Sequence, residues 1–316
     1  MEALPRIEPP LESKFLEDEY REVSKEDITV VIPTLNEEEA IGLVIEQVLL
    51  EGYNKILVVD GNSADNTVKI AKSYGVKVIQ QHGRGKTGAI QTAIEHVKTP
   101  YMVVIDGDLT YDPADIEKLI PHIKNYNEVI GVREIGRNNI TRLNRLGNWM
   151  INTTFNILFG TKLRDLCSGM YALKTDFAKD LRLSTQGFDV EVEIAAQAAS
   201  SYSITDVQIS YGKRIGKRKL HPIRDGIKIF ITTWRLARAY NPVLLYSSLA
   251  ALTIFPALAI LVFSSIQGIL GYWSESTMLY GALLMLFSIQ FMTLGIITAQ
   301  QRRMEQRIIK RLIKIY

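Results

Sequence analysis

The chain has 316 residues, which is enough for one large domain or two of ordinary size. Its single cysteine, Cys167, excludes an internal disulfide and fits a cytosolic compartment, and its four histidines lack the spacing of a zinc site. The net charge of +3 hides an acidic beginning, because residues 1–27 carry nine acidic and four basic side chains.

We expect residues 1–27 to form a flexible acidic tail, whose composition does not match a cleavable signal peptide. From residue 28 to residue 132, short apolar runs alternate with stretches of helical pattern. This alternation predicts an α/β fold with a doubly wound, mostly parallel sheet and helices on both faces. The expected strands are 28–33, 55–60, 76–80, 101–105 and 128–132, and the helices between them end near residues 50, 74, 97 and 124.

The acidic turn Asp106-Gly107-Asp108 follows the apolar run Tyr101–Ile105. Open α/β sheets bind ligands at the carboxyl ends of their strands, which is where this turn is expected. Two aspartates two positions apart repel each other unless a cation lies between them, and carboxylate oxygens suit Mg²⁺ or Mn²⁺. The turn therefore indicates a divalent metal next to phosphate groups, with a solvated acidic turn as the simpler alternative.

A glycine-rich segment, Gly83–Gly88, matches the dinucleotide-binding pattern G-x-G-x-x-G in outline. It follows the third expected strand rather than the first, and a phosphate loop would need a glycine where the chain has Gln80. We therefore assign neither motif. A bare backbone that carries Arg84 and Lys86 can nevertheless approach a diphosphate.

The pattern changes after residue 132. Residues 133–148 carry four arginines and precede an apolar helix at about 149–159, which we interpret as a basic loop entering a helix near a membrane surface. A turn at 165–171 leads into a strand, a helix spans 187–200, and a closing strand lies within 202–211. Five bases follow within residues 213–219.

Two uncharged runs, residues 241–274 and 276–301, each exceed the roughly 20 residues that span a bilayer. Bases flank the pair at its outer ends and are absent from its connecting loop. The positive-inside rule then predicts a hairpin in the cell membrane, with both termini and the preceding domain on the cytoplasmic side. The amphipathic segment 223–240 and the basic segment 302–316 are typical of helices on a lipid surface. A core-facing helix at 223–240 and a soluble hairpin are the alternatives.

Several motifs occur in one order along the chain: IPTLNEE, VVDGNSADNT, RGKTGA, the acidic turn, Gly131-Val132-Arg133, CSGMYAL and a basic Lys-Leu segment. Over about residues 28–240 the chain therefore resembles the family 2 glycosyltransferases of the polyprenyl-phosphate type, which comprise the dolichyl-phosphate mannose synthase group and its glucose and N-acetylglucosamine relatives. The resemblance implies a glycosyltransferase A fold for a catalytic domain at 28–222. It also implies a nucleotide-sugar donor, a Mg²⁺ or Mn²⁺ cofactor and a dolichyl or other polyprenyl-phosphate acceptor.

The resemblance also assigns roles to particular residues. Many members carry a glutamine as a further metal contact where this chain has Thr110, and the basic segment departs from the usual serine before Lys-Leu. By matching position, Pro33, Leu35, Glu37 and Asp60 would hold the nucleoside, Asp106 and Asp108 the metal, and Arg133 the acceptor phosphate, while Thr110 stands where the further metal contact would be. The family's next arginine and serine on the acceptor side have no match in this chain. The substitute candidates for the acceptor phosphate are Arg142, Arg145, Asn148, Lys213 and Arg214, and Lys86 is expected near the diphosphate.

A lipid phosphate is already an anionic nucleophile near neutral pH, so its glycosylation needs no strong general base. A metal neutralises the leaving diphosphate, arginines hold the acceptor phosphate, and direct attack inverts the anomeric carbon. Asp189 and Glu191 would contact the sugar, or they are simply acids favoured at a helix N-terminus. The sugar stays open between mannose from GDP and glucose or N-acetylglucosamine from UDP, with a weak preference for UDP.

Two other functions are compatible with the same residues. A transferase that extends a polysaccharide would attack with a sugar hydroxyl and would need a base, for which Asp189 and Asp165 are candidates. A non-catalytic nucleotide-sugar-binding membrane scaffold is the second. Nucleic acid is not an expected partner, because the basic residues cluster next to hydrophobic spans. Membrane lipid is an expected partner. The oligomeric state stays open.

Overall fold

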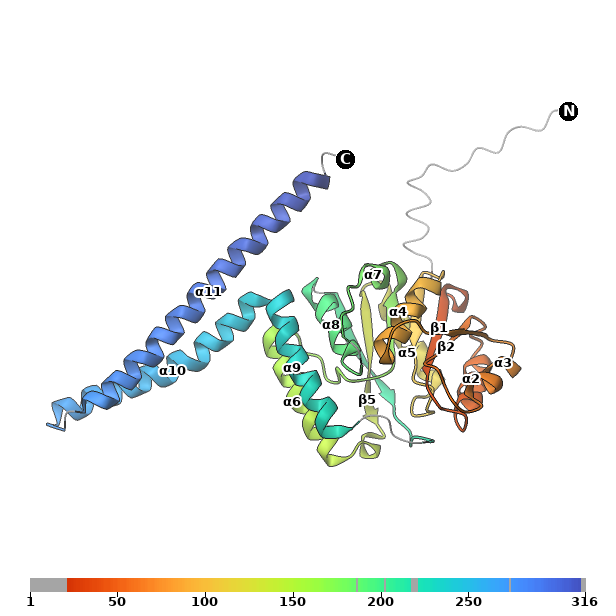
Figure 1. Cartoon of the computed structure of the whole chain (residues 1–316), viewed down its shortest axis with the longest axis horizontal. Coiled ribbons are helices and arrows are strands. Elements are labelled where there is room, and N and C mark those ends of the chain that lie inside the picture. Colours follow the sequence, from red (N-terminus) through yellow and green to blue (C-terminus); the bar gives the residue numbers. More distant parts are fainter. Residues whose placement is uncertain (1–21, 186, 202, 217–220, 273, 314–316) are drawn as a thin grey trace.

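A computed structural model describes residues 22–185, 187–201, 203–216, 221–272 and 274–313 (Figure 1). Residues 1–21 of the expected acidic tail 1–27, residues 217–220 of the basic segment and the last three residues lie outside these ranges, while the end of that tail is described and contains a short 3-10 helix, Lys25–Asp27. The basic side chains after Gln301 are also outside what is described, although the backbone there is helical up to Ile313.

A mixed, mostly parallel sheet lies at the centre of the domain, in the order β3-β2-β1-β4-β6-β5-β7. The strands β1 to β4 are parallel neighbours, and β5 is parallel to β7. The strand β6 runs antiparallel to both β4 and β5. The strands are β1 (Ile28–Thr34), β2 (Ile56–Asp60), β3 (Lys77–Gln80), β4 (Tyr101–Val104), β5 (Glu128–Ile135), β6 (Tyr171–Lys174) and β7 (Ile204–Ser210).

The reversed direction of β6 matters for the position of the site. Because Val104 at the end of β4 pairs with Tyr171 at the start of β6, the chain enters β6 at the edge where β1, β2 and β4 end. The turn before β6 therefore lies beside the acidic turn that follows β4.

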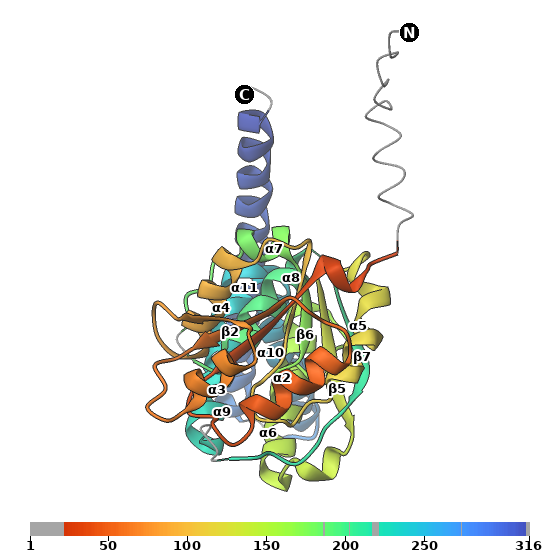
Figure 2. The same ribbon diagram turned by 90° about the vertical axis from the view of Figure 1, so that its right-hand side faces the viewer.

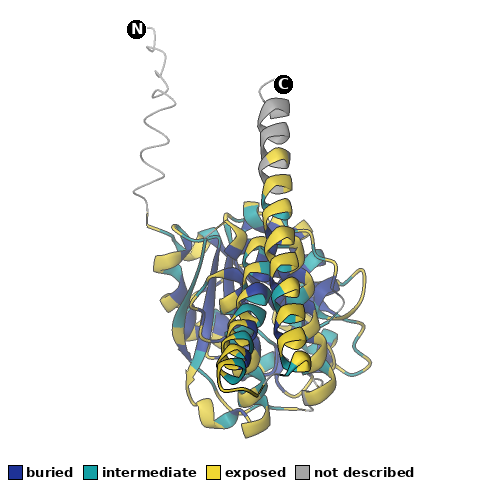
Figure 3. Cartoon of the chain, turned by 90° about the vertical axis from the view of Figure 1, so that its left-hand side faces the viewer, coloured by how far each residue is buried: buried dark blue, intermediate teal, exposed yellow. Residues whose placement is uncertain are grey.

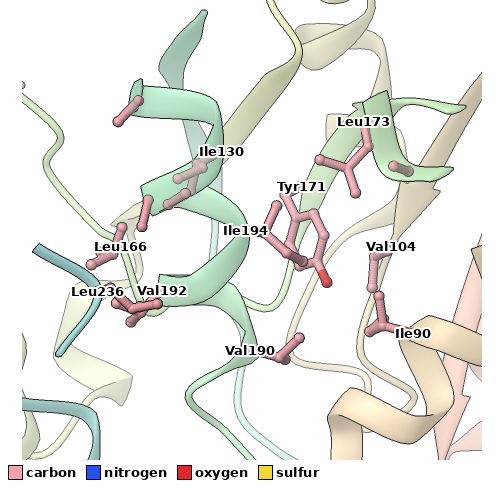
Figure 4. Close-up of a cluster of buried hydrophobic side chains, with 14 of the residues drawn as sticks. Ile90, Val104, Ile130, Leu166, Tyr171, Leu173, Val190, Val192, Ile194 and Leu236 are labelled. Carbon is pink, nitrogen blue, oxygen red and sulfur yellow. The ribbon is translucent and has the colours of Figure 1, made fainter. Parts of the chain in front are cut away.

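Helices cover both faces of the sheet (Figure 2). Strand side chains alternate between two hydrophobic clusters, as the two-residue period of a strand requires, so that Val104 faces one cluster and Val103 the other. Figure 4 shows the first cluster, in which Tyr171 lies among Val104, Ile90 and Ile194. The covering helices are α2 (Ile41–Leu50), α3 (Thr67–Ser73), α4 (Gly85–His96), α5 (Ile116–Ile123), α6 (Arg142–Phe159), α7 (Thr175–Asp180), α8 (Val190–Ser200) and α9 (Pro222–Tyr240).

Two helices begin earlier than the sequence pattern predicts. The glycine-rich segment Gly83–Gly88 already contains the first turn of α4, in which a Cβ at Gly88 would lie 2.8 Å from the carbonyl oxygen of His82. Glycine is needed there so that the helix can start against the preceding turn. The helix α6 begins at Arg142 behind the N-cap Thr141, so the arginines 142 and 145 are helical rather than in a loop.

Helix α9 packs beside α6 and leads directly into the hairpin of α10 (Pro242–Ile269) and α11 (Glu275–Ile313) (Figure 1). It buries Ile229 and Leu236 but leaves Ile223, Ile227 and Ile231 exposed. One side of α9 thus faces the protein core, as the core-facing alternative expects, while the three isoleucines form a separate exposed stripe. An exposed apolar stripe on an amphipathic helix is typical of the membrane interface.

The hairpin extends away from the sheet and exposes most of its side chains, as the yellow colouring of Figure 3 shows. Its two apolar segments, Pro242–Ile269 and Glu275–Gln301, have mean hydropathies of 2.3 and 2.0 and bury only 17% and 11% of their most apolar windows inside the protein. They are long and apolar enough to cross a membrane. The expected surface helix at 302–316 is not separate over the described residues, because α11 continues to Ile313.

Candidate active site

The acidic turn after β4 is held against the end of β1. A Cβ at Gly107 would lie 3.3 Å from Ile32 Cγ2, so the turn approaches β1 closely. Leu109 has a φ of 61°, which is uncommon for a residue other than glycine and is found at functional turns. The Asp108 Oδ1 atom accepts hydrogen bonds from the Thr110 backbone nitrogen at 3.1 Å and from its Oγ1 at 2.5 Å. Thr110 thus orients Asp108 and, being buried, does not line the cavity described below.

Lys86 joins the acidic turn to helix α8. Its Nζ lies 2.6 Å from Asp106 Oδ1 and 2.6 Å from Glu191 Oε1. Burial lowers the pKa of Lys86, but the two carboxylates outweigh it and hold that pKa well above its ordinary value. Burial also raises the pKa of Glu191, against the opposing effect of Lys86. Lys86 therefore stays protonated at physiological pH as the fixed positive charge of this cluster.

The turn before β6 makes room for Asp106. A Cβ at Gly169 would overlap the Asp106 carboxylate, so only glycine fits at this position. The Gly169 backbone nitrogen donates to the Tyr111 hydroxyl at 2.6 Å, which fixes the turn from the other side. The motif around Cys167 and Ser168 is therefore explained by the close approach of two turns at one edge of the sheet.

Arg214 is paired with the acidic turn and with Glu37. Its Nη1 donates to Asp108 Oδ2 at 2.7 Å, and its Nη2 donates to Glu37 Oε1 at 2.6 Å. The sequence predicted an acceptor-phosphate contact for Arg214, and the structure instead pairs it with two residues expected at the metal and the nucleoside.

Arg133 is fixed by a carboxylate. Its Nε and Nη2 atoms donate to the two oxygens of Asp165, each at 2.7 Å, and its guanidinium lies 5.3 Å from the centre of the Tyr211 ring. With its amide oriented to satisfy its neighbours, Asn148 accepts from Arg133 Nη2 at 3.1 Å. This planar, two-point pairing leaves the guanidinium little freedom to reorient.

A cavity of about 790 Å³ connects these groups. It is lined by the charged side chains of Lys86, Asp106, Asp108, Arg133 and Glu191. Helices α6 and α9 add an apolar lining through Leu143, Leu146, Met150, Ile223, Ile227 and Phe230. Lys213, Arg214 and Asn148 also line it.

The expected nucleoside residues lie in the last two residues of β1 and β2 or shortly after β1, at the same edge of the sheet, but do not line this cavity. Asp60 caps its own turn, because its Oδ2 accepts from the backbone nitrogens of Asn62 and Ser63, each at 3.0 Å. Glu37 is buried, whereas Leu35 is 40% exposed and Pro33 is partly exposed. Only Glu37 of these four reaches the acidic turn, through Arg214.

Of the residues expected at the acceptor phosphate or the sugar, three do not line the cavity. Arg142 and Arg145 lie on the first turns of α6 without lining it. Asp189 is buried against α9, where its oxygens accept from Lys228 Nζ at 3.2 Å and Thr232 Oγ1 at 3.0 Å. Of the two acids at the start of α8, only Glu191 faces the site, while Asp189 holds α8 to α9.

Sequence reasoning missed the residues that position others. Tyr111 behind Gly169 and Tyr211 against Arg133 carry no motif of their own, and Asp165, which was considered only as a general base, pairs with Arg133. Tyr111 lies three residues after Asp108, and this spacing gave no chemical reason to select it. Their roles depend on contacts between segments more than 30 residues apart in the sequence.

The donor set is compatible with a divalent metal. Asp106 and Asp108 supply hard oxygen ligands from one turn, and glycine at position 169 keeps the space around Asp106 open. Within the described residues no cluster of three or more metal-binding acidic, histidine or cysteine side chains occurs. Mg²⁺ ordinarily binds through one or two carboxylates together with substrate phosphates and waters, so two aspartates suffice.

Comparison with known proteins agrees with this arrangement. The family model "Glycosyl transferase family 2" matches residues 29–182. Glycosyltransferase AglJ of Haloferax volcanii is 33% identical over 295 residues, which cover 88% of this chain and 97% of the relative. The dolichyl-phosphate hexose transferase of the same organism is 32% identical over 213 residues, covering 66% of this chain and 92% of the relative.

A structural neighbour agrees on the fold. Glucosyl-3-phosphoglycerate synthase from Mycobacterium tuberculosis, in complex with Mn²⁺, uridine-diphosphate-glucose and phosphoglyceric acid, superimposes with a TM-score of 0.58 at 21% identity. The match covers 74% of this chain and 88% of the synthase. The acidic turn lies at the sheet edge, the fold matches that of the synthase, and AglJ aligns with this chain over nearly the whole length of AglJ. The chain therefore belongs to glycosyl transferase family 2.

Proposed function

We propose that this glycosyltransferase moves a hexose from a nucleotide sugar to a dolichyl or other polyprenyl phosphate at the cytoplasmic surface of the cell membrane. The observation that carries the proposal is the cavity that joins the acidic turn to the apolar walls of α6 and α9. A diphosphate and a lipid need opposite surroundings, and this cavity offers both within one space. The product would be a lipid-phosphate-linked sugar that serves protein glycosylation.

The donor end is assigned to the acidic turn. Asp106 and Asp108 would hold Mg²⁺ or Mn²⁺, which neutralises the leaving diphosphate. Support comes from the related synthase, which was crystallised with Mn²⁺ and uridine-diphosphate-glucose. Lys86 adds a positive charge that does not titrate near neutral pH, and Glu191 lies where sugar hydroxyls would pass. UDP is the preferred nucleotide and GDP the alternative.

The acceptor end is assigned to Arg133, with Asn148 and Lys213 beside it. An oxygen of the lipid phosphate attacks the anomeric carbon and forms the new carbon–oxygen bond. The bond from that carbon to the diphosphate breaks, and the nucleoside diphosphate leaves with the electron pair. Attack from the side opposite the leaving group inverts the anomeric carbon. The apolar side chains of α6 and α9 would receive the first isoprene units.

A sugar hydroxyl as acceptor has less support. That reaction needs a free general base, and the two acids considered for it are both engaged: Asp165 holds Arg133 through both oxygens, and Asp189 binds α9. A phosphate nucleophile, which needs no such base, agrees better with this arrangement. The names of relatives also favour it, because one is a dolichyl-phosphate hexose transferase and another, from Pyrococcus furiosus, a dolichol-phosphate mannosyltransferase.

The test is a panel of UDP-glucose, UDP-N-acetylglucosamine and GDP-mannose, each incubated with the purified full-length protein, polyprenyl phosphate and Mn²⁺. One donor is expected to give a lipid-linked sugar that mild acid releases, and Asp108→Asn should give none. Transfer to oligosaccharide acceptors but not to polyprenyl phosphate would refute the acceptor assignment. Full transfer by Asp108→Asn would refute the role of the acidic turn.

The contribution of the hairpin can be tested separately. A chain ending at residue 240 is assayed with a short-chain, water-soluble polyprenyl phosphate. Retained activity indicates that the hairpin is an anchor, whereas loss in a folded protein indicates that it contributes to acceptor binding. Protease accessibility of both termini in sealed vesicles tests the proposed cytoplasmic orientation.

A further inference from the structure

One guanidinium connects two strand ends in the donor half of the site. Arg214 contacts Asp108 after β4 at 2.7 Å and Glu37 after β1 at 2.6 Å. All three side chains are largely buried: Arg214 is 25% exposed, and the two carboxylates 6% and 7%. Charge-assisted hydrogen bonds of this length are stronger than neutral ones, and more so where little water surrounds them.

The backbone around Arg214 fixes it in this position. The Gly212 nitrogen donates to the Thr110 carbonyl at 2.7 Å, and the Ile215 nitrogen donates to the Asp108 carbonyl at 3.1 Å. Gly216 has a φ of +86° and approaches Glu37 so closely that a Cβ would lie 3.4 Å from Oε2. The segment 211–216 is therefore anchored on the acidic turn at both sides of Arg214.

These contacts use both carboxylate oxygens of Asp108. Oδ1 accepts from Thr110, and Oδ2 accepts from Arg214. A divalent cation bound to Asp108 would come within a few ångströms of the guanidinium, where two positive charges repel each other strongly because little water screens them. Arg214 and a divalent cation therefore oppose each other's binding at Asp108 Oδ2.

We propose that Arg214 is a positioning residue that competes with the divalent metal for Asp108. It neutralises Asp108 and Glu37, holds their carboxylates in place, and releases Asp108 when the metal binds. This inference rests on the proposed metal role of the acidic turn.

The experiment measures Mn²⁺ binding by the full-length protein without nucleotide, from the electron paramagnetic resonance signal of free Mn²⁺. Removing one charge-assisted hydrogen bond from Asp108 should make Arg214→Gln bind Mn²⁺ about tenfold more tightly than wild type. Arg214→Lys keeps the charge but offers a single point contact, so its affinity should lie between the two. Arg182→Gln, an equal change of charge at an exposed position, is the control and should match wild type.

Asp108→Asn separates failure of this inference from failure of the proposed metal site. If Asp108→Asn binds Mn²⁺ as wild type does, the metal site itself is misassigned. If Asp108→Asn abolishes binding while Arg214→Gln binds no more tightly than wild type, only the competition is overturned. The Mn²⁺-dependent rise in melting temperature, which should be larger for Arg214→Gln than for wild type, repeats the test and shows that the variant is folded.

Discussion

Gly169→Ala tests the geometry of the site without removing any functional group. A Cβ at position 169 would lie 2.5 Å from Asp106 Cγ and 2.9 Å from Oδ1. Nonbonded carbon atoms prefer separations of about 3.5–4.0 Å, so the carboxylate must move by about 1 Å. A displacement of about 1 Å in a reacting group costs roughly 100-fold in rate. We therefore expect kcat to fall by about 100-fold.

The change should spare the fold, because the Asp106 side chain is 30% exposed and can turn further into the cavity. The assay measures kcat and KM for both substrates, with the melting temperature followed in parallel. Gly295→Ala in α11 is a matched control: its Cβ would make an ordinary contact of 3.5 Å with Tyr246 Cβ, and its kcat should match wild type. Wild-type kcat in Gly169→Ala would refute the argument that the position of Asp106 governs catalysis.

Three further changes probe other parts of the molecule. Arg133→Lys cannot reproduce the two-point pairing with Asp165. It should raise KM for the polyprenyl phosphate by about tenfold or more, with little change in KM for the donor. Equal changes in both KM values would contradict the acceptor role. Asp189→Asn weakens the contact between α8 and Lys228 of α9. We therefore expect weaker binding of a long-chain acceptor in membranes but unchanged donor hydrolysis, with both measured on the same preparation. A selective loss of donor hydrolysis would instead place Asp189 at the sugar. Glu128 is buried and its pKa is raised well above the ordinary value, by burial first and Glu191 second. Protonation of Glu128 therefore favours the folded state. Its contribution to the free energy of unfolding is fully present below the pKa of glutamate in the unfolded chain, about 4.3, and is lost as the pH rises through the pKa of Glu128 in the folded protein. Glu128→Gln should be more stable than wild type at pH 8 and flatter with pH in denaturant titrations, and an unchanged pH profile would count against this reasoning.

The two acids at the start of α8 show how a helix terminus can serve two purposes. Glu191 binds Lys86 in the site, and Asp189 binds α9, the helix that precedes the membrane hairpin. Two residues apart on a helix, these side chains point in different directions. The first turn of α8 thereby links the donor end of the cavity to the helix expected at the membrane interface.

The sequence alone predicted the alternation of strands and helices, the acidic turn and the two long apolar segments. These features are local, because each can be recognised in one continuous stretch of sequence. One is a strand end followed by two aspartates, and the other is an uncharged run long enough to span a bilayer. The family followed from the order of several such motifs, and the comparisons confirmed it.

Tertiary structure decided which charged side chains meet. The sequence could not place Arg214 on Asp108 and Glu37, pair Arg133 with Asp165, or separate Glu191 from Asp189, because each pairing joins segments far apart in the chain or depends on which face of a helix is buried. The sequence also could not show that β6 is inserted antiparallel, which brings the turn at Gly169 to the edge where β4 ends. Local pattern fixes which groups are present, whereas strand order and direction fix their distances.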